Sequence, residues 1–167
     1  MRKMTEENLK SAFAGESQAH LKYLAFADKA DMEKLPNVAR LFRANSFAEQ
    51  VHATNHLRAL SGIKPTLDNL KEAVAGENFE VEEMYPAYIS VAIEQNEKGA
   101  EQSKKWALAA EKVHAGLYQK AAQSVGQGRD ADLKSIHVCG VCGWTVEGEA
   151  PDKCPVCGSP REKFKKF

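Results

Sequence analysis

Apolar side chains recur every three or four residues from Thr5 to about Val125, and few glycines or prolines interrupt them. This spacing matches one face of an α-helix, because a helix turns once every ~3.6 residues. The segment is also rich in Ala, Glu, Lys, Leu and Gln, which favour helices. The pattern therefore predicts an all-helical domain over residues 1–125.

Capping residues and helix breakers divide this domain into four long helices and one short one. The predicted helices run from Thr5, as the N-cap, to about Met32; from Pro36 to just before Ser61; from Leu67 to Ala75, as a short crossover helix; from about Gly76 to near Lys98; and on to about Val125. A short turn joins the first two helices, so we expect them to be antiparallel. Pro86 lies inside the third long helix and removes one backbone hydrogen bond, so we expect a kink there.

The composition excludes some classes of partner. Lys plus Arg and Asp plus Glu number 23 each, so the formal net charge is zero and no basic surface for nucleic acid or an anionic membrane is expected. No stretch is apolar enough to span a bilayer, and the N-terminus has no apolar signal core. We therefore expect a cytoplasmic protein.

A two-fold internal repeat places carboxylates and histidines at matching positions of the predicted helices. The segment Ala14–Glu16 recurs as Ala75–Glu77. A Glu-x-x-His motif follows each copy: Glu49–His52 begins 33 residues after the first repeated Glu, and Glu111–His114 begins 34 residues after the second. Each Glu lies on the mainly apolar stripe of its helix, so one carboxylate per long helix is predicted to point into the core.

Carboxylates in a core need compensating cations, because an unpaired buried charge loses several kcal/mol of hydration. One Glu from each of two helices and a Glu-x-x-His from each of the other two form the ligand pattern of di-iron carboxylate bundles with the ferritin-like fold. Ordinary surface residues would explain either motif alone, but the repeat argues against this alternative. The predicted ligands of two metal ions are Glu16, Glu49, His52, Glu77, Glu111 and His114.

Other polar residues lie near these positions. Glu80 is about 60° from Glu77 around the helix, which makes it a candidate fifth carboxylate. Tyr23 and Tyr85 follow the two repeated Glu residues by seven and eight positions, and either core packing or a hydrogen bond to a ligand carboxylate would explain them. Two further histidines on inward stripes are assigned structural or supporting roles: His20 and His56.

All four cysteines lie in the C-terminal segment, as two Cys-x-x-Cys-Gly motifs after a polar linker over residues 126–135. In a reducing compartment this clustering indicates a metal site rather than disulfides, so residues 136–167 are predicted to form a small metal-binding domain. The predicted ligands are Cys139, Cys142, Cys154 and Cys157. The glycine after each motif permits the positive φ of a tight turn, and Trp144 and Phe164 are expected to pack against the hairpin. Tetrahedral thiolate sites suit either zinc or iron.

Taken together, these segments resemble the rubrerythrin family over essentially the whole chain. The matching segments are Gly15–Ala19, Glu77–Glu80, Met84–Pro86, both Glu-x-x-His motifs and the cysteine-containing tail. The resemblance implies an all-α ferritin-like four-helix bundle with a small C-terminal rubredoxin-like β/loop domain. It also implies iron in the four-cysteine site and a cytoplasmic peroxidase of anaerobic or microaerophilic microbes.

The resemblance further implies roles for individual residues. Glu49 and Glu111 would bridge two irons, with Glu16 and Glu77 as terminal ligands and His114 on one iron. The other iron would exchange His52 in the reduced state for Glu80 in the oxidised state. The catalytic candidates are accordingly Glu80, His52, Tyr23 and Tyr85.

The expected reaction is reduction of hydrogen peroxide to water in protection against oxidative stress. Electrons would pass through the four-cysteine iron from an external NAD(P)H-dependent reductase or a rubredoxin, because no nicotinamide or flavin site is evident. The resemblance implies a head-to-tail homodimer, and a long crossover over residues 62–75 would permit exchange of helix pairs. The alternatives are a ferroxidase that handles iron with dioxygen, and a non-enzymatic helical module with a zinc ribbon.

Overall fold

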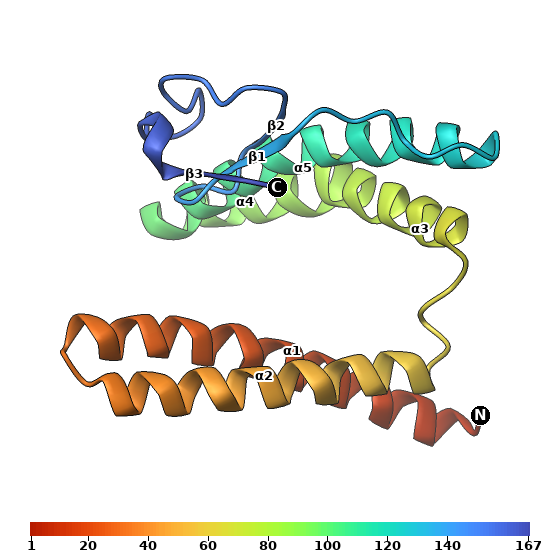
Figure 1. The fold of residues 1–167 in the computed structure, drawn as a ribbon, viewed down its shortest axis with the longest axis horizontal. Helices are drawn as coiled ribbons and strands as arrows, with labels where there is room; N and C mark the ends of the chain where they lie inside the picture. Colours follow the sequence, from red (N-terminus) through yellow and green to blue (C-terminus); the bar gives the residue numbers. More distant parts are fainter. The chain divides into compact units, whose positions relative to one another are not determined.

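The structure is a computed structural model that describes residues 1–167. The helices are α1 (Lys3–Met32), α2 (Pro36–Ala59), α3 (Thr66–Phe79), the π-helix η1 (Glu80–Met84), α4 (Tyr85–Glu94), α5 (Lys98–Gly126) and the short 3-10 helix η2 (Arg161–Lys163). The strands are β1 (Ile136–Cys139), β2 (Thr145–Glu147) and β3 (Phe164–Lys166) (Figure 1). The chain forms two compact units, Met1–Lys64 and Pro65–Phe167, which are described separately.

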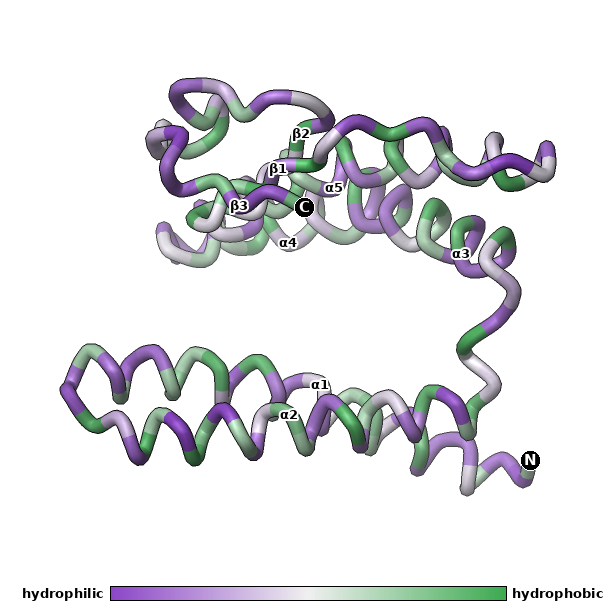
Figure 2. Tube along the Cα trace, viewed as in Figure 1, coloured by the Kyte–Doolittle hydropathy of each residue, from purple (hydrophilic) through white to green (hydrophobic).

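The first unit is a helical hairpin of α1 and α2 (Figure 1). The buried residues between these helices are small: Ala27, Ala30, Ala39, Ser46 and Ala53. Small side chains let the helix backbones approach closely. Large apolar side chains such as Phe47 (66% exposed) lie on the surface of this unit, and Figure 2 shows hydrophobic and hydrophilic residues alternating along both helices.

In the second unit, α3, η1 and α4 follow one another and contact α5 (Figure 1). The prediction of a separate crossover helix over residues 67–75 is wrong, because α3 continues from Thr66 through Gly76 to Phe79. A glycine inside a helix costs only about 1 kcal/mol, which does not end a helix that has strong helix formers on both sides. The connection between α2 and α3 is therefore short, residues 60–65.

The remaining helix boundaries agree closely with the sequence pattern, with two corrections. The first helix begins at Lys3 with Arg2 as its N-cap, so the predicted capping role of Thr5 is wrong. The distortion expected at Pro86 takes the form of the π-helix that ends just before Tyr85. The Tyr85 N–H donates to the carbonyl of Glu80, five residues back, instead of four.

The C-terminal segment folds into a three-stranded antiparallel sheet in the order β2-β1-β3. Cys139, Cys142 and Cys154 are buried at its core, and Trp106 of α5 packs against them. Trp144 and Phe164 also pack there, edge to face with ring centroids 6.3 Å apart, which confirms the prediction. No helix of the chain combines the length and the hydropathy that crossing a bilayer requires.

Candidate metal centres

The first unit brings together Glu16 of α1 with Glu49 and His52 of α2, whose candidate ligand atoms all lie within 4.8 Å of one another. The Nδ1 atom of His52 is 2.9 Å from Oε2 of Glu49 and 3.9 Å from Oε1 of Glu16. The i,i+3 spacing of the motif explains the short contact, because residues three apart share a helix face. The His52 side chain is 54% exposed in this unit.

The second unit forms a matching cluster from Glu77 of α3 with Glu111 and His114 of α5. The Nδ1 atom of His114 is 2.7 Å from Oε2 of Glu111 and 3.8 Å from Oε2 of Glu77. The two clusters therefore have the same ligand types and closely similar contacts, as the internal repeat predicts. In both, the histidine presents Nδ1 to the carboxylates, which indicates the nitrogen that would bind a metal.

Glu77 is the residue whose environment most directly favours a bound cation. Its Oε2 atom is buried and has no hydrogen-bond partner. Burial, followed by the neighbouring Glu111 carboxyl, raises the pKa of Glu77 from 4.5 to about 7. A buried carboxylate without a donor is costly, and a divalent cation between Glu77, Glu111 and His114 would remove that cost. The residues present therefore fit a metal ion.

Glu80 and Tyr85 lie on either side of the π-turn beside the second cluster. Burial and the charge of Glu111 raise the pKa of Glu80, while His114 acts in the opposite direction. Burial and the carboxyls of Glu80, Glu111 and Glu77 raise the pKa of Tyr85. The π-turn holds one residue more than an α-turn, which explains why Tyr85 follows its Glu by eight residues whereas Tyr23 follows Glu16 by seven.

In the first unit, Tyr23 packs against aromatic side chains. Its ring centroid is 6.0 Å from that of Phe42 and 6.3 Å from that of Phe26. His20 bonds through Nδ1 to the backbone oxygen of Ser46, at 2.9 Å, and lies 2.8 Å from the Ser46 hydroxyl. Both residues therefore contribute to packing between α1 and α2, which favours the structural interpretation of each.

The four cysteine sulfurs form a compact group in which each residue offers one ligand atom. The Sγ atoms of Cys139 and Cys157 are 3.6 Å apart, and those of Cys142 and Cys154 are 3.5 Å apart. These separations are far longer than a disulfide and close to the ~3.8 Å edge of a tetrahedron with metal–sulfur bonds of about 2.3 Å. The side chains are therefore arranged for a single tetrahedral ion.

Local interactions prepare this site for thiolate ligands. The Ser159 hydroxyl oxygen lies 3.1 Å from Sγ of Cys157, and its hydrogen bonding lowers the pKa of Cys157 to about 6, whereas burial raises the pKa of Cys142. Gly143 and Gly158 have φ of +80° and +74°, as predicted, and their N–H groups donate to the carbonyls of Cys139 and Cys154. Glycine is needed here for its backbone conformation, since both positions have open space for a Cβ.

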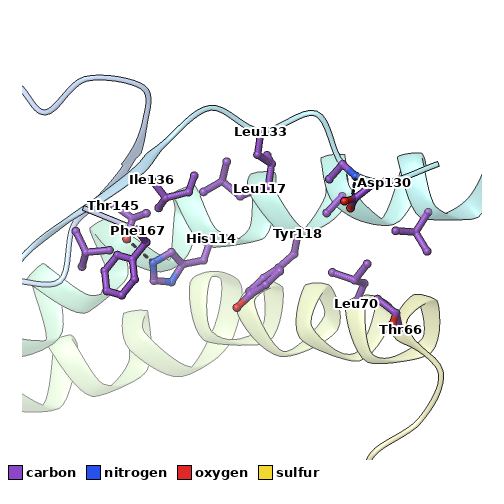
Figure 3. A pocket seen from close by; sticks show the side chains of 14 residues that line it. Thr66, Leu70, His114, Leu117, Tyr118, Asp130, Leu133, Ile136, Thr145 and Phe167 are labelled. Atoms are coloured by element: carbon purple, nitrogen blue, oxygen red, sulfur yellow. Dashed lines mark hydrogen bonds between the residues drawn. The ribbon is translucent and has the colours of Figure 1, made fainter. Parts of the chain in front are cut away.

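Sequence reasoning missed one residue next to the second cluster. The Nε2 atom of His114 lies 2.8 Å from the hydroxyl of Thr145, on strand β2. Figure 3 shows these side chains pointing toward each other at the wall of a cavity of about 590 Å³, which Leu70, Tyr118 and other residues line. Thr145 carries no signal in the sequence, because the contact joins segments 31 residues apart.

Comparison with known proteins identifies the family of the chain. The rubrerythrin family model matches residues 7–122, and the model of the rubredoxin-like domain of rubrerythrin matches residues 137–165. Rubrerythrin-2 of Clostridium acetobutylicum is 38% identical, over 98% of this chain and 97% of the relative. Nigerythrin of Nitratidesulfovibrio vulgaris is 35% identical, over 96% of this chain and 85% of the relative.

The solved structures agree with the sequence comparison. The structure of nigerythrin in a partially reduced state has a TM-score of 0.56 and 34% identity, and the match covers 98% of this chain and 86% of that one. The two family models together cover residues 7–122 and 137–165, which hold both Glu/Glu/His clusters and the four-cysteine group. The chain therefore belongs to the rubrerythrin family, with the side chains of a di-iron site in a ferritin-like helical domain and of a rubredoxin-like four-cysteine iron site.

Proposed function

We propose that this chain is a peroxidase that uses two iron ions to reduce hydrogen peroxide to water in protection against oxidative stress. The observation that carries the proposal is the pair of matching clusters, each with two carboxylates and one histidine. Together their carboxylates carry enough negative charge to balance two ferrous ions. In this proposal Glu49 and Glu111 would be shared by the two irons, Glu16 and Glu77 would each bind one iron, and His52 and His114 would complete the set.

When bound, the two irons supply one electron each to the oxygen–oxygen bond. Reduction of one peroxide molecule to two water molecules also consumes two protons. Glu80 is suited to deliver a proton, because its raised pKa keeps the carboxyl protonated to higher pH than usual. The phenol of Tyr85 also has a raised pKa, so it stays protonated and would donate a hydrogen bond to the peroxide substrate. His52 and Glu80 would serve as alternative ligands of one iron, His52 in its reduced state and Glu80 in its oxidised state.

The four cysteines would hold an iron ion, which would supply one-electron transfer from an external donor. An NAD(P)H-dependent reductase or a rubredoxin would supply the electrons, since the chain has no motif set for a nicotinamide or flavin. Cys139, Cys142 and Cys154 are buried, whereas Cys157 is half-buried and marks the side from which a donor would approach. Free thiolate ligands require a reducing compartment, which supports a cytoplasmic location.

The short connection between α2 and α3 favours a homodimer with exchanged helix pairs. A long crossover returns the chain to the end where the previous helix began, so the second and third long helices of a ferritin-like bundle are parallel. Suppose that Glu49 and Glu77 lie at the same level in two parallel helices. The end of α2 is then about 15 Å beyond Glu49 along the helix axis, and the start of α3 is about 16 Å before Glu77. The connection must span the sum of these two lengths. The segment from Ala59 to Thr66 reaches only about 25 Å when fully extended. A second copy of the chain would then supply the other half of each di-iron site.

The peroxidase proposal is tested by rapid mixing of the anaerobic, iron-loaded and fully reduced protein with hydrogen peroxide or with dioxygen. We expect peroxide to oxidise the protein much faster, as followed by the visible absorption of the ferric four-cysteine site. A Glu111→Ala variant, which lacks one cluster ligand, should lose this fast reaction. Faster oxidation by dioxygen would instead indicate a ferroxidase.

A further inference from the structure

We propose that Cys157 is a site of reversible oxidation by hydrogen peroxide, and that its oxidised sulfur forms a disulfide with Cys139 and releases the metal of the four-cysteine site. The chemistry concerns only the C-terminal segment of the second unit. Its consequence, an interruption of the electron supply to the di-iron site when peroxide is in excess, rests on the proposed function. The oxidation itself does not.

The four cysteines differ in their access to solvent. Cys139, Cys142 and Cys154 are 1%, 9% and 2% exposed, whereas Cys157 is only half-buried. Coordination to a metal keeps all four sulfurs as thiolates, and peroxide oxidises those thiolates that solvent can reach. Cys157 is therefore the ligand that peroxide reaches most readily.

A second sulfur lies beside Cys157. The Sγ atom of Cys139 is 3.6 Å from Sγ of Cys157, which is about 1.5 Å more than the length of a disulfide bond. Oxidation of a cysteine is reversible when a second thiol can attack the oxidised sulfur. Cys139 is almost completely buried, so peroxide does not reach it and its sulfur stays available for that attack.

This pair joins the two Cys-x-x-Cys motifs. Cys139 ends strand β1 in the first motif, and Cys157 is the last cysteine of the second, 18 residues further on. The other short separation, 3.5 Å between Cys142 and Cys154, also joins the two motifs. A disulfide between Cys139 and Cys157 therefore holds the two motifs together after the metal has left, so that reduction can restore the site.

The reaction has two steps. The Cys157 thiolate attacks hydrogen peroxide: a sulfur–oxygen bond forms, the oxygen–oxygen bond breaks, and hydroxide leaves, so the sulfur becomes a sulfenic acid. The Cys139 thiolate then attacks this sulfur, and a second hydroxide leaves as the disulfide forms. Two thiolates thus lose two electrons to one peroxide molecule, and two protons from solvent convert the hydroxides to water. The metal loses two of its four ligands.

The test uses the full-length protein loaded with zinc, which does not change its oxidation state. Excess hydrogen peroxide is added, the remaining thiols are alkylated, and trypsin digestion with mass spectrometry maps the products. Cleavage after Lys134, Lys153 and Arg161 leaves the first motif in peptide 135–153 and the second in peptide 154–161. A disulfide between the motifs therefore links two peptides, whereas a disulfide within a motif links none.

We expect the linked peptides as the first product, with fragmentation assigning the bond to Cys139 and Cys157. One zinc ion should be released per disulfide, as measured with a colorimetric chelator, and dithiothreitol should restore all four thiols. Disulfides within the motifs would overturn the proposal. Sulfinic or sulfonic acid at Cys157 without a link, or four unmodified thiols, would also overturn it.

Two further measurements test the roles of exposure and folding. Dimedone, which traps sulfenic acids, should label Cys157 and none of the three buried cysteines during the reaction. Labelling of a buried cysteine instead would reject Cys157 as the site of attack. In the chain unfolded by urea, with its zinc chelated, disulfides within the motifs should predominate because short loops close most easily. The same pairing in the folded and unfolded chains would reject the role of the folded geometry.

In the iron-loaded protein, the visible absorption of the ferric four-cysteine site follows the same reaction. Excess peroxide should bleach this absorption as the linked peptides form, and dithiothreitol with added iron should restore it. Bleaching without the link would contradict the proposal. If the wild type fails to reduce peroxide catalytically, the proposed function fails, while the zinc-loaded protein still decides whether Cys157 is oxidised.

Discussion

Among single residues, Glu77 bears the clearest electrostatic cost in the metal-free protein. Its pKa is raised from 4.5 to about 7, chiefly by burial, so the folded protein favours the protonated carboxyl. A raised pKa contributes stability that is present below pH ~4.5 and is lost as the pH rises through about 7. The same residue is a predicted metal ligand. Metal binding favours its ionised carboxylate, whereas the stability of the metal-free protein favours its protonated carboxyl.

We therefore expect Glu77→Gln to stabilise the metal-free protein at pH 8 but to weaken metal binding. The gain in the free energy of unfolding should shrink as the pH falls from 8 to 5, because the wild-type carboxyl becomes protonated. Urea unfolding of both proteins at the two pH values, followed by circular dichroism, measures this. Glu82→Gln, in the following helical turn and exposed, is the control. An equal change at both pH values would contradict the electrostatic explanation.

Glu80 provides a second prediction for a single residue. If its carboxyl delivers a proton to bound peroxide, Glu80→Gln should lower kcat by about 100-fold, since positioned proton transfer contributes roughly 10²–10⁴ in rate. Glu83→Gln is the matched control, because Glu83 lies in the same π-turn but is exposed. Steady-state peroxide reduction with a saturating electron donor measures both. Similar rates for the two variants would exclude a special role for Glu80.

At the scale of elements, the small sheet depends on its metal more than the helices do. Strands β1, β2 and β3 contain three or four residues each, and their shared core consists largely of the cysteine ligands. So small an apolar core cannot hold a sheet without a metal ion or another cross-link. The long helices, by contrast, have their own backbone hydrogen bonds and packing.

Removal of the tail metal should therefore disorder the sheet and leave the helices folded. Both tryptophans of the chain, Trp106 and Trp144, pack against the cysteine cluster, so their fluorescence reports on it directly. We expect Cys154→Ser to change the tryptophan emission and near-ultraviolet circular dichroism, with far-ultraviolet helical signal largely kept. Lys153→Ser, at the adjacent exposed position, is the control and should leave all three signals unchanged. Loss of the helical signal in Cys154→Ser would show that the two parts fold together.

At the scale of the whole molecule, the proposed exchange of helix pairs predicts complementation between two inactive chains. One chain carries Glu16→Ala and Glu49→Ala, and the other carries Glu77→Ala and Glu111→Ala. In an exchanged heterodimer, one site receives both intact halves and the other receives both altered halves. Each heterodimer in the mixture should then recover about one di-iron site, by iron analysis and peroxide reduction of the separated heterodimer, whereas neither chain alone recovers any.

A variant with a longer connection between α2 and α3 is the control for this experiment. Inserting about twelve Gly and Ser residues after Gly62 would add roughly 40 Å of reach, enough for one chain to place its helix pairs in parallel. The lengthened protein should become monomeric with its iron content kept, as measured by light scattering. A wild-type protein that binds two irons as a monomer would reject exchange and favour a simple up-and-down bundle.

The ligand sets and most helices could be predicted from the sequence because they depend on short-range spacing. Period ~3.6 patterns, the i,i+3 motifs and the Cys-x-x-Cys-Gly turns place chemical groups within a few residues of each other. The recurrence of the segment around Glu16 at Glu77 then predicted that the two helix pairs carry matching ligand sets. Local spacing also predicted the positive φ of Gly143 and Gly158.

Only the tertiary structure decided the features that depend on contacts between distant segments. The continuity of α3 through Gly76 shortened the connection, because packing on α5 outweighs the small cost of one glycine. The pairing of His114 with Thr145 depends on how β2 meets α5, and no local pattern contains that information. The sequence by itself thus determined which groups can bind metal, whereas the fold determined the burial of Glu77 and the hydrogen bond that orients His114.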